Sequence, residues 1–119
     1  MKNLIKIAFV FLLMGSSSVF SQDWREGLTF LPATVTSDYC VQLDADQPVA
    51  EWYVMDISHM DFTNQTEAQQ AFWVRQNNLV SYTVILDEHK AYAHIHLDRT
   101  STPQDIVWWN DFLNSMCEH

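Results

Sequence analysis

The alternation of hydrophobic and polar residues changes its period along this chain, and residues 51–59 (EWYVMDISH) have the period of a β-strand. Tyr53, Met55 and Ile57 then share one side, which we expect to contact the core. The opposite side carries Trp52, Val54, Asp56 and Ser58.

A helical pattern follows in residues 63–78 (TNQTEAQQAFWVRQNN). Thr66 is placed to cap this helix, because Gln69 comes three residues later, as in a capping box. The expected buried face consists of Ala68, Ala71, Phe72 and Leu79.

Residues 80–98 (VSYTVILDEHKAYAHIHLD) predict a β-hairpin that turns at Asp87 to Lys90. If Asp87 pairs with Lys90, every second residue on each strand is apolar, and these residues fall on one face. That face carries Tyr82, Val84, Leu86, Ala91, Ala93 and Ile95. The other face carries Thr83, Ile85, Tyr92, His94 and His96.

A second helix is expected near the end of the chain, with Thr102 as its cap, Pro103 at its first position and Asp105 completing a capping box. Its apolar residues recur every three or four positions and should be buried. They are Ile106, Trp109, Leu113 and Met116.

The order of elements from residue 51 is strand, helix, strand, strand, helix, which predicts an α+β fold. A right-handed crossover leaves room for the last strand to insert, antiparallel, between the other two, with both helices on one sheet face. We expect residues 38–45 to add a further strand by pairing with residues 51–59. Residues 22–37 are expected to form an arm that covers a sheet edge. The predicted sheet is antiparallel, with three to four strands.

Residues 1–21 have the pattern of a signal peptide: Lys2 and Lys6, a short apolar run, and small residues before Gln22. The apolar run is too short to span a bilayer. The chain is therefore expected to be exported, to the periplasm or beyond the cell, with residues 38–119 as one domain and no membrane span in the mature form.

The formal net charge is −9, from 6 Lys and Arg against 15 Asp and Glu. Loss of Lys2 and Lys6 would leave 4 − 15 = −11. Such a chain repels phosphate backbones, so nucleic-acid binding is not expected.

Cys40 and Cys117 are the two cysteines of the chain. In an oxidising compartment a disulfide is the expected state, with two free thiols as the alternative. They are too far apart in sequence for a CxxC redox motif.

The residues support three functional hypotheses. The favoured one is docking with another protein, or with a second copy, through the sheet face that the helices leave open. That face would present Trp52, Val54, Ile85 and Tyr92. The alternative is that residues 22–37 cover this face, which would leave no docking patch.

The alternative hypothesis is a zinc or copper site, because His94 and His96 share a strand face that Asp56 of the neighbouring strand could approach. His59 and Met60 form a second candidate pair for copper. The third hypothesis is catalysis, with His94 as a base, Asp56 as its orienting carboxylate and Ser58 as a hydroxyl. No nucleophile motif or cofactor fingerprint accompanies these residues, so we expect neither an enzyme nor a resident cofactor.

Residues 63–113 (TNQTEAQQAFWVRQNNLVSYTVILDEHKAYAHIHLDRTSTPQDIVWWNDFL) resemble the ferredoxin-like, heavy-metal-associated domains of bacterial metal chaperones and copper transporters. The resemblance implies their fold. The metal ligands of that family are a CxxC pair in the loop between the first strand and the first helix. Here that loop, residues 59–64, reads HMDFTN, so the thiolate site does not carry over. The chain also resembles small secreted bacterial proteins.

Overall fold

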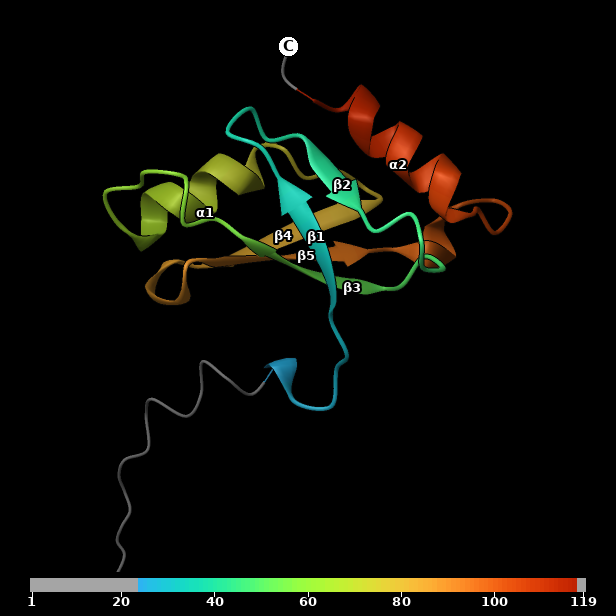
Figure 1. Cartoon of the computed structure of the whole chain (residues 1–119), viewed down its shortest axis with the longest axis horizontal. Helices are drawn as coiled ribbons and strands as arrows, with labels where there is room; N and C mark the ends of the chain where they lie inside the picture. Colours follow the sequence, from blue (N-terminus) through green and yellow to red (C-terminus); the bar gives the residue numbers. More distant parts are fainter. Residues whose placement is uncertain (1–23, 118–119) are drawn as a thin grey trace, which may run out of the picture.

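The computed structural model describes residues 24–117, and the predicted signal peptide lies outside these residues. Three strands precede the first helix and two more precede the second (Figure 1). The strands are β1 (Leu31–Val35), β2 (Val41–Leu43), β3 (Trp52–Asp56), β4 (Val80–Ile85) and β5 (Lys90–Ile95), and the helices are α1 (Gln65–Trp73) and α2 (Ile106–Ser115).

The five strands form one sheet in the order β2-β1-β3-β5-β4. β5 lies between β3 and β4 and is antiparallel to both, as the sequence predicted. β1 is parallel to β3 and antiparallel to β2. The protein is therefore α+β, with a mostly antiparallel sheet and both helices on the same sheet face (Figure 1).

The prediction for the N-terminal strands was wrong. Residues 38–45 do not pair with residues 51–59, because β2 pairs with β1 instead. Residues 31–35, which we had assigned to an arm, form β1 inside the sheet. The turn between β1 and β2 explains this pairing: Tyr39 adopts a left-handed φ of 66°, and its N–H donates to the Thr36 carbonyl at 2.9 Å. Such a short connection has a low cost of loop closure.

The β4–β5 hairpin differs from the prediction by two residues in register. Ile85, rather than Asp87, pairs with Lys90, since residues 86–88 form a turn of 3₁₀ helix that His89 closes at a φ of 55°. A shift of two residues keeps every side chain on its expected face. Val84, Ala91 and the other apolar residues expected in the core are buried, except Leu86, which is half-buried in the turn.

Both helices begin at caps other than those predicted. Asn64 caps α1 by accepting from the Glu67 N–H at 2.8 Å, and Asp105 caps α2 by accepting from the Trp108 N–H at 2.9 Å. Each side chain satisfies an N–H group that has no partner within its helix. α1 also ends at Trp73, so Leu79 lies outside it.

The core lies between the two helices and one face of the sheet. Trp109 and Leu113 are buried as predicted, whereas Met116 is 44% exposed and does not belong to the core. Phe72 and Ala68 of α1 complete the helical side. The sheet side includes Tyr53, Met55, Val80, Tyr82, Val84, Ala91, Ala93 and Ile95.

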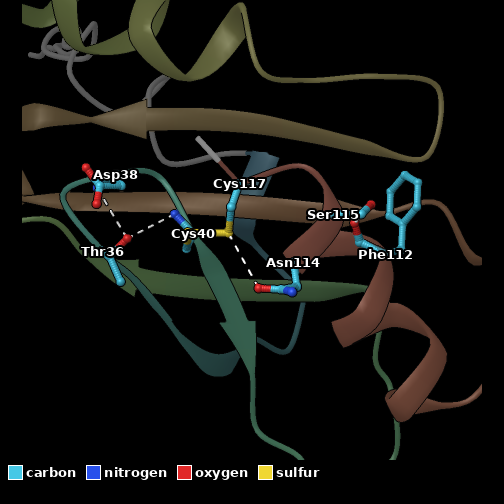
Figure 2. Close-up of a disulfide and its surroundings, with 7 residues drawn as sticks. All are labelled: Thr36, Asp38, Cys40, Phe112, Asn114, Ser115 and Cys117. Atoms are coloured by element: carbon cyan, nitrogen blue, oxygen red, sulfur yellow. Dashed lines mark hydrogen bonds between the residues drawn. A yellow bond between two sulfur atoms is a disulfide. The ribbon is translucent and has the colours of Figure 1, made fainter. Parts of the chain in front are cut away.

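The predicted disulfide is confirmed: Cys40 and Cys117 are bonded, with their Cα atoms 4.8 Å apart (Figure 2). The bond joins the residue before β2 to the residue that follows the α2 cap. Beside it, Thr36 Oγ1 accepts from the Cys40 N–H at 3.1 Å. The disulfide therefore ties the end of α2 to the turn between β1 and β2.

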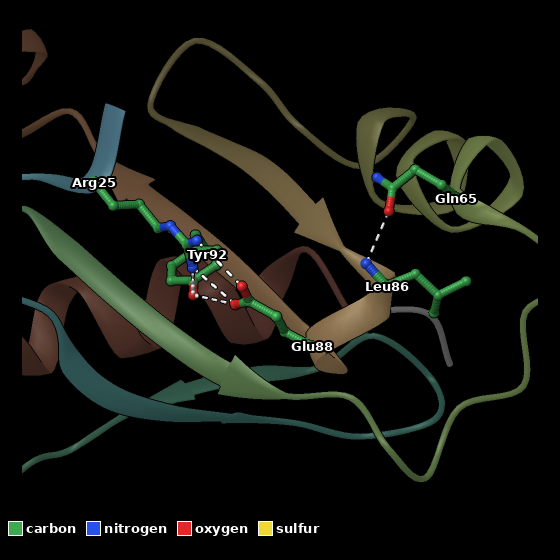
Figure 3. Close-up of polar contacts among 5 residues, drawn as sticks. All are labelled: Arg25, Gln65, Leu86, Glu88 and Tyr92. Carbon is green, nitrogen blue, oxygen red and sulfur yellow. Dashed lines mark hydrogen bonds and ion pairs between the residues drawn. The ribbon is translucent and has the colours of Figure 1, made fainter. Parts of the chain in front are cut away.

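Amide side chains cover the outer edges of the sheet. Gln69 of α1 donates to the Tyr82 carbonyl at 3.0 Å and accepts from the Val84 N–H at 2.8 Å. Gln65 bonds in the same way: it donates to the Val84 carbonyl at 2.6 Å and accepts from the Leu86 N–H at 2.8 Å, the second of which Figure 3 shows. At the opposite edge, Asn110 of α2 accepts from the Leu43 N–H at 2.8 Å and donates to its carbonyl at 3.2 Å.

Within residues 24–117, neither helix has the length and apolar character needed to cross a membrane.

Candidate functional site: the helix-free face of the sheet

The sheet face turned away from the helices is the helix-free face. Alternation along the paired strands assigns its residues. They are Pro32, Thr34, Trp52, Val54, Asp56, Ser81, Thr83, Ile85, Lys90, Tyr92 and His94, with His96 directly after β5. All four residues predicted for a docking face, Trp52, Val54, Ile85 and Tyr92, lie on it.

The N-terminal segment, residues 24–30, lies across this face below the sheet in Figure 1. Trp24 and Phe30 from the segment and Trp52 and Tyr92 from the sheet form an aromatic cluster. The Trp24 ring lies 5.3 Å from that of Tyr92 and 5.6 Å from that of Trp52, between centroids. The corresponding distances from Phe30 are 5.1 Å and 5.9 Å. These distances and the tilted or edge-on angles are those of favourable ring pairs.

The segment reduces the accessibility of the predicted docking residues. Tyr92 is only 6% exposed, whereas Trp24 on the outside of the cluster is 36% exposed. We had expected the N-terminal arm to cover a sheet edge, with covering of the open face as the alternative. Residues 24–30 cover part of the helix-free face, as in that alternative. Residues 24–30 have no periodic pattern that marks this contact, because they are not part of a strand.

Arg25 holds the segment to the sheet by polar contacts (Figure 3). Its two terminal nitrogens donate to the two Glu88 carboxylate oxygens at 2.8 and 3.2 Å, and one of them also donates to the Tyr92 hydroxyl at 2.6 Å. This paired geometry is specific for a planar guanidinium. The hydrogen bonds from Arg25 hold the pKa of the Glu88 carboxyl below its usual range.

A second feature of the face is the histidine cleft, a hollow of about 360 Å³ at the end of β5. His94 Nε2 lies 2.9 Å from a Glu51 carboxylate oxygen, and the His94 ring stacks on Trp52 at 3.9 Å between centroids. His96 Nε2 lies 2.6 Å from Ser81 Oγ. The lining residues are Glu51, His94, His96, Leu97, Asp98 and Arg99.

The pKa of His96 is lowered, first by burial and then by electrostatic interaction with His94 and Arg99. Asp98 and Glu51 act in the opposite direction but more weakly. The neutral form of His96, which can accept a hydrogen bond from Ser81, is therefore favoured in the folded protein.

Of the residues predicted as metal ligands, His94 and His96 lie side by side, with ring centroids 4.0 Å apart, but the others are distant from this pair. Asp56 pairs with Lys90, whereas His94 pairs with Trp52 at the other end of β3, so Asp56 lies four residues, roughly 13 Å, from the histidines along the strand. Glu51 is the carboxylate that meets His94 instead. His59 and Met60 follow β3 beyond Asp56 and line a different pocket. No group of three or more His, Cys, Asp or Glu within residues 24–117 is arranged to hold a metal ion.

The residues considered for catalysis are likewise separated, because Asp56 and Ser58 lie at the opposite end of β3 from His94. The hydroxyl beside a histidine is that of Ser81, which we had not considered. Its position was accessible from the sequence: the alternation of Thr83 and Ile85 on the helix-free face continues to Ser81.

No known family model matches this chain, and no curated protein or solved structure compared with it matches either.

Proposed function

We propose that this protein is a small exported module that binds a polypeptide segment of another protein through its helix-free face. The observation that supports the proposal most directly is the aromatic cluster. Trp52 and Tyr92 are covered by a short segment of 3₁₀ and turn structure rather than by a strand or an α-helix, and Trp24 at its surface is 36% exposed. Aromatic residues are enriched where proteins bind one another.

The hydrogen bonds at the two sheet edges favour a partner that binds to the sheet face over one that adds a strand at an edge. An incoming strand needs free N–H and C=O groups at an edge strand. In β4 the outward groups of Val84 are bonded to Gln65 and Gln69, and in β2 those of Leu43 are bonded to Asn110. Strand addition would have to displace these amides.

A polypeptide is the occupant that the structure favours, since a polypeptide segment of the chain itself already lies on the face. The charge of −9 opposes binding to nucleic acid. The ferredoxin-like arrangement and export to an oxidising compartment belong to the proposal. They are supported by the insertion of β5 between β3 and β4 and by the disulfide.

Catalysis is not part of the proposal. His96 contacts a hydroxyl, but the Glu51 carboxylate contacts His94 rather than His96. The base beside Ser81 is therefore not oriented by a carboxylate, as it would be in a Ser-His-Asp triad.

Site-specific photocrosslinking tests the proposal. A photoreactive amino acid replaces Thr83, which is exposed on the helix-free face, and in a matched control it replaces Val107, which is 61% exposed on α2. We expect a protein that crosslinks from position 83 and not from position 107. With that protein purified, Ile85→Asp should weaken binding at least tenfold and Val107→Ala should not. Equal crosslinking from both positions, or no effect of Ile85→Asp, would overturn the proposal.

The competing function is metal handling by His94 and His96 with copper or zinc. Elemental analysis of the protein from its native compartment separates the two functions. A stoichiometric metal that His94→Ala with His96→Ala removes would replace protein binding as the conclusion.

A further inference from the structure

The N-terminal segment is held on the helix-free face by its side chains. Its described backbone makes one internal hydrogen bond, from the Leu28 N–H to the Arg25 carbonyl at 3.2 Å, in a turn where Gly27 has a φ of 80°. The contacts with the sheet are those of the Trp24 and Phe30 rings and the Arg25 guanidinium. An occupant held in this way can be exchanged without breaking a β-ladder.

Trp24 and Arg25 together define the chemistry that this surface accepts. One ring fits against Trp52 and Tyr92, and the next residue directs a guanidinium at the Glu88 carboxylate and the Tyr92 hydroxyl. The Arg25 side chain is 14% exposed and that of Glu88 is 38% exposed, so the pair is partly shielded from water. A lysine could not reproduce the two parallel hydrogen bonds.

The charge of the molecule favours the same class of partner. With 15 acidic residues against 6 basic ones, the protein attracts cationic segments and repels acidic ones. Glu88, in the turn between β4 and β5, lies beside Tyr92 of the aromatic cluster, so a segment with a cation beside an aromatic ring can contact both at once.

We infer that the binding surface recognises a partner segment in which an aromatic residue is adjacent to an arginine, and that residues 24–30 occupy this surface in its absence. This inference rests on the proposed function and specifies the partner and the regulation of the same surface. Because residues 24–30 are attached to the domain, their effective concentration at the surface is in the millimolar range. A partner must therefore bind the surface more tightly than these residues do in order to displace them.

A peptide with the sequence of residues 24–30, WREGLTF, is the probe. It is titrated into the exported protein and into a Trp24→Ala, Arg25→Ala variant, with circular dichroism to verify that the variant is folded. We expect the variant to bind the peptide at least tenfold more tightly than the wild type, because its own segment competes less. Arg25→Ala alone retains both aromatic rings of the segment. If the double variant does not fold, Arg25→Ala takes its place in the titration. This single variant should also bind the peptide more tightly than the wild type does.

Charge recognition is tested by Glu88→Gln in the background of the folded variant. The peptide should bind that protein at least tenfold more weakly, and a peptide with alanine in place of arginine should lose affinity to the same extent. Asp87→Asn is the matched control, because Asp87 is the exposed neighbour of Glu88 and has no contact with Arg25 among the described hydrogen bonds. It should bind the peptide normally.

Two results would overturn the inference: a folded variant that does not bind the peptide, or binding that is indifferent to Glu88. A wild-type dimer that forms with increasing concentration and is lost in Glu88→Gln would assign the surface to the segment of a second copy instead. If the peptide fails while the crosslinked partner still depends on Ile85, the proposed function stands without this recognition chemistry. If the peptide does not bind and the crosslinked partner does not depend on Ile85, the helix-free face is not a binding surface.

Discussion

Trp109 is the largest side chain that is fully buried, and its environment shows how single residues determine the stability of this domain. Its ring lies edge-on to Phe112 and Trp108 of the same helix, at 6.0 and 5.0 Å between centroids. Val107, two residues earlier, is 61% exposed on the same helix. Two positions of α2 that are two residues apart therefore differ greatly in what they contribute to the core.

We expect Trp109→Ala to lower the free energy of unfolding by about 3 to 5 kcal/mol and Leu113→Ala by about 2 to 5 kcal/mol, because each would leave a cavity in the core. Val107→Ala is the control and should change stability by less than about 0.5 kcal/mol. Urea denaturation of the three variants gives these values. A larger effect of Val107→Ala than of Trp109→Ala would contradict the orientation of α2.

His96 should make stability depend on pH. Its pKa in the folded protein is below the unfolded value of about 6.5, so the unfolded chain binds the proton more readily. The contribution of His96 to stability should therefore be fully present above about pH 6.5. It should be lost as the pH falls through the pKa that His96 has in the folded protein. The lowered pKa of Glu88 acts in the same direction at more acidic pH.

Thermal melts of the wild type and His96→Gln over this range provide the measurement. Glutamine does not titrate, so the variant should lose the part of the pH dependence that begins near pH 6.5 and retain the more acidic part. Identical slopes in the two proteins near pH 6.5 would show that His96 is not the group responsible.

At the scale of elements, the contact between α1 and β4 depends on matched repeats. Gln65 and Gln69 are four residues apart, a rise of about 6 Å on a helix, and the backbone groups they meet are spaced by two residues, about 6.8 Å, on a strand. Each amide can therefore bond to successive outward groups of β4. The helix replaces the neighbouring strand that β4 lacks.

Gln69→Ala should lower the free energy of unfolding by about 1 to 3 kcal/mol, because two backbone hydrogen bonds of about 0.5 to 1.5 kcal/mol each are lost. Gln70→Ala, at an exposed position on the same helix, is the control and should be close to neutral. The exposed edge should also favour association, so sedimentation of Gln65→Ala with Gln69→Ala should reveal larger species. A monomeric double variant of unchanged stability would refute the role of the amides.

The elements also show which features the sequence could predict. The predicted sheet faces are correct even where the predicted register is wrong. The hairpin register differs from the prediction by two residues, but Tyr82, Ala93 and Ile95 are still in the core, since alternation has a period of two. The predicted first residues of the helices were wrong. For α2, Thr102 and Asp105 are both acceptable caps, and the local sequence does not distinguish between them.

For the molecule as a whole, the missed features are the non-local ones. Parallel pairing of β1 with β3 joins residues 22 apart, such as Leu31 and Tyr53, and the contact of Arg25 with Glu88 joins residues 63 apart. Neither leaves a periodic signal in the sequence. The candidate site was therefore predictable in its strand residues, Trp52, Val54, Ile85 and Tyr92. Covering of these residues by the N-terminal arm was foreseen only as an alternative, and the contacts that Arg25 and Trp24 make were not predicted.

The disulfide is a non-local contact that the sequence did predict, because only two cysteines are present. It closes a separation of 77 residues and joins the β1–β2 turn to α2. A bond across so long a loop acts mainly by limiting the unfolded chain, which predicts a stabilisation of about 4 kcal/mol in the chain-entropy model.

Replacing both cysteines by serine should therefore cost about 4 kcal/mol of a total that is typically about 5 to 15 kcal/mol. The denaturant slope should also rise, because an unfolded chain without the crosslink exposes more surface. Urea denaturation of the oxidised wild type and of the variant measures both quantities, with the wild type under reductant as a control that should match the variant. A small loss with an unchanged slope would mean that the hydrogen bonds between Asn110 and Leu43, rather than the disulfide, hold α2 against β2.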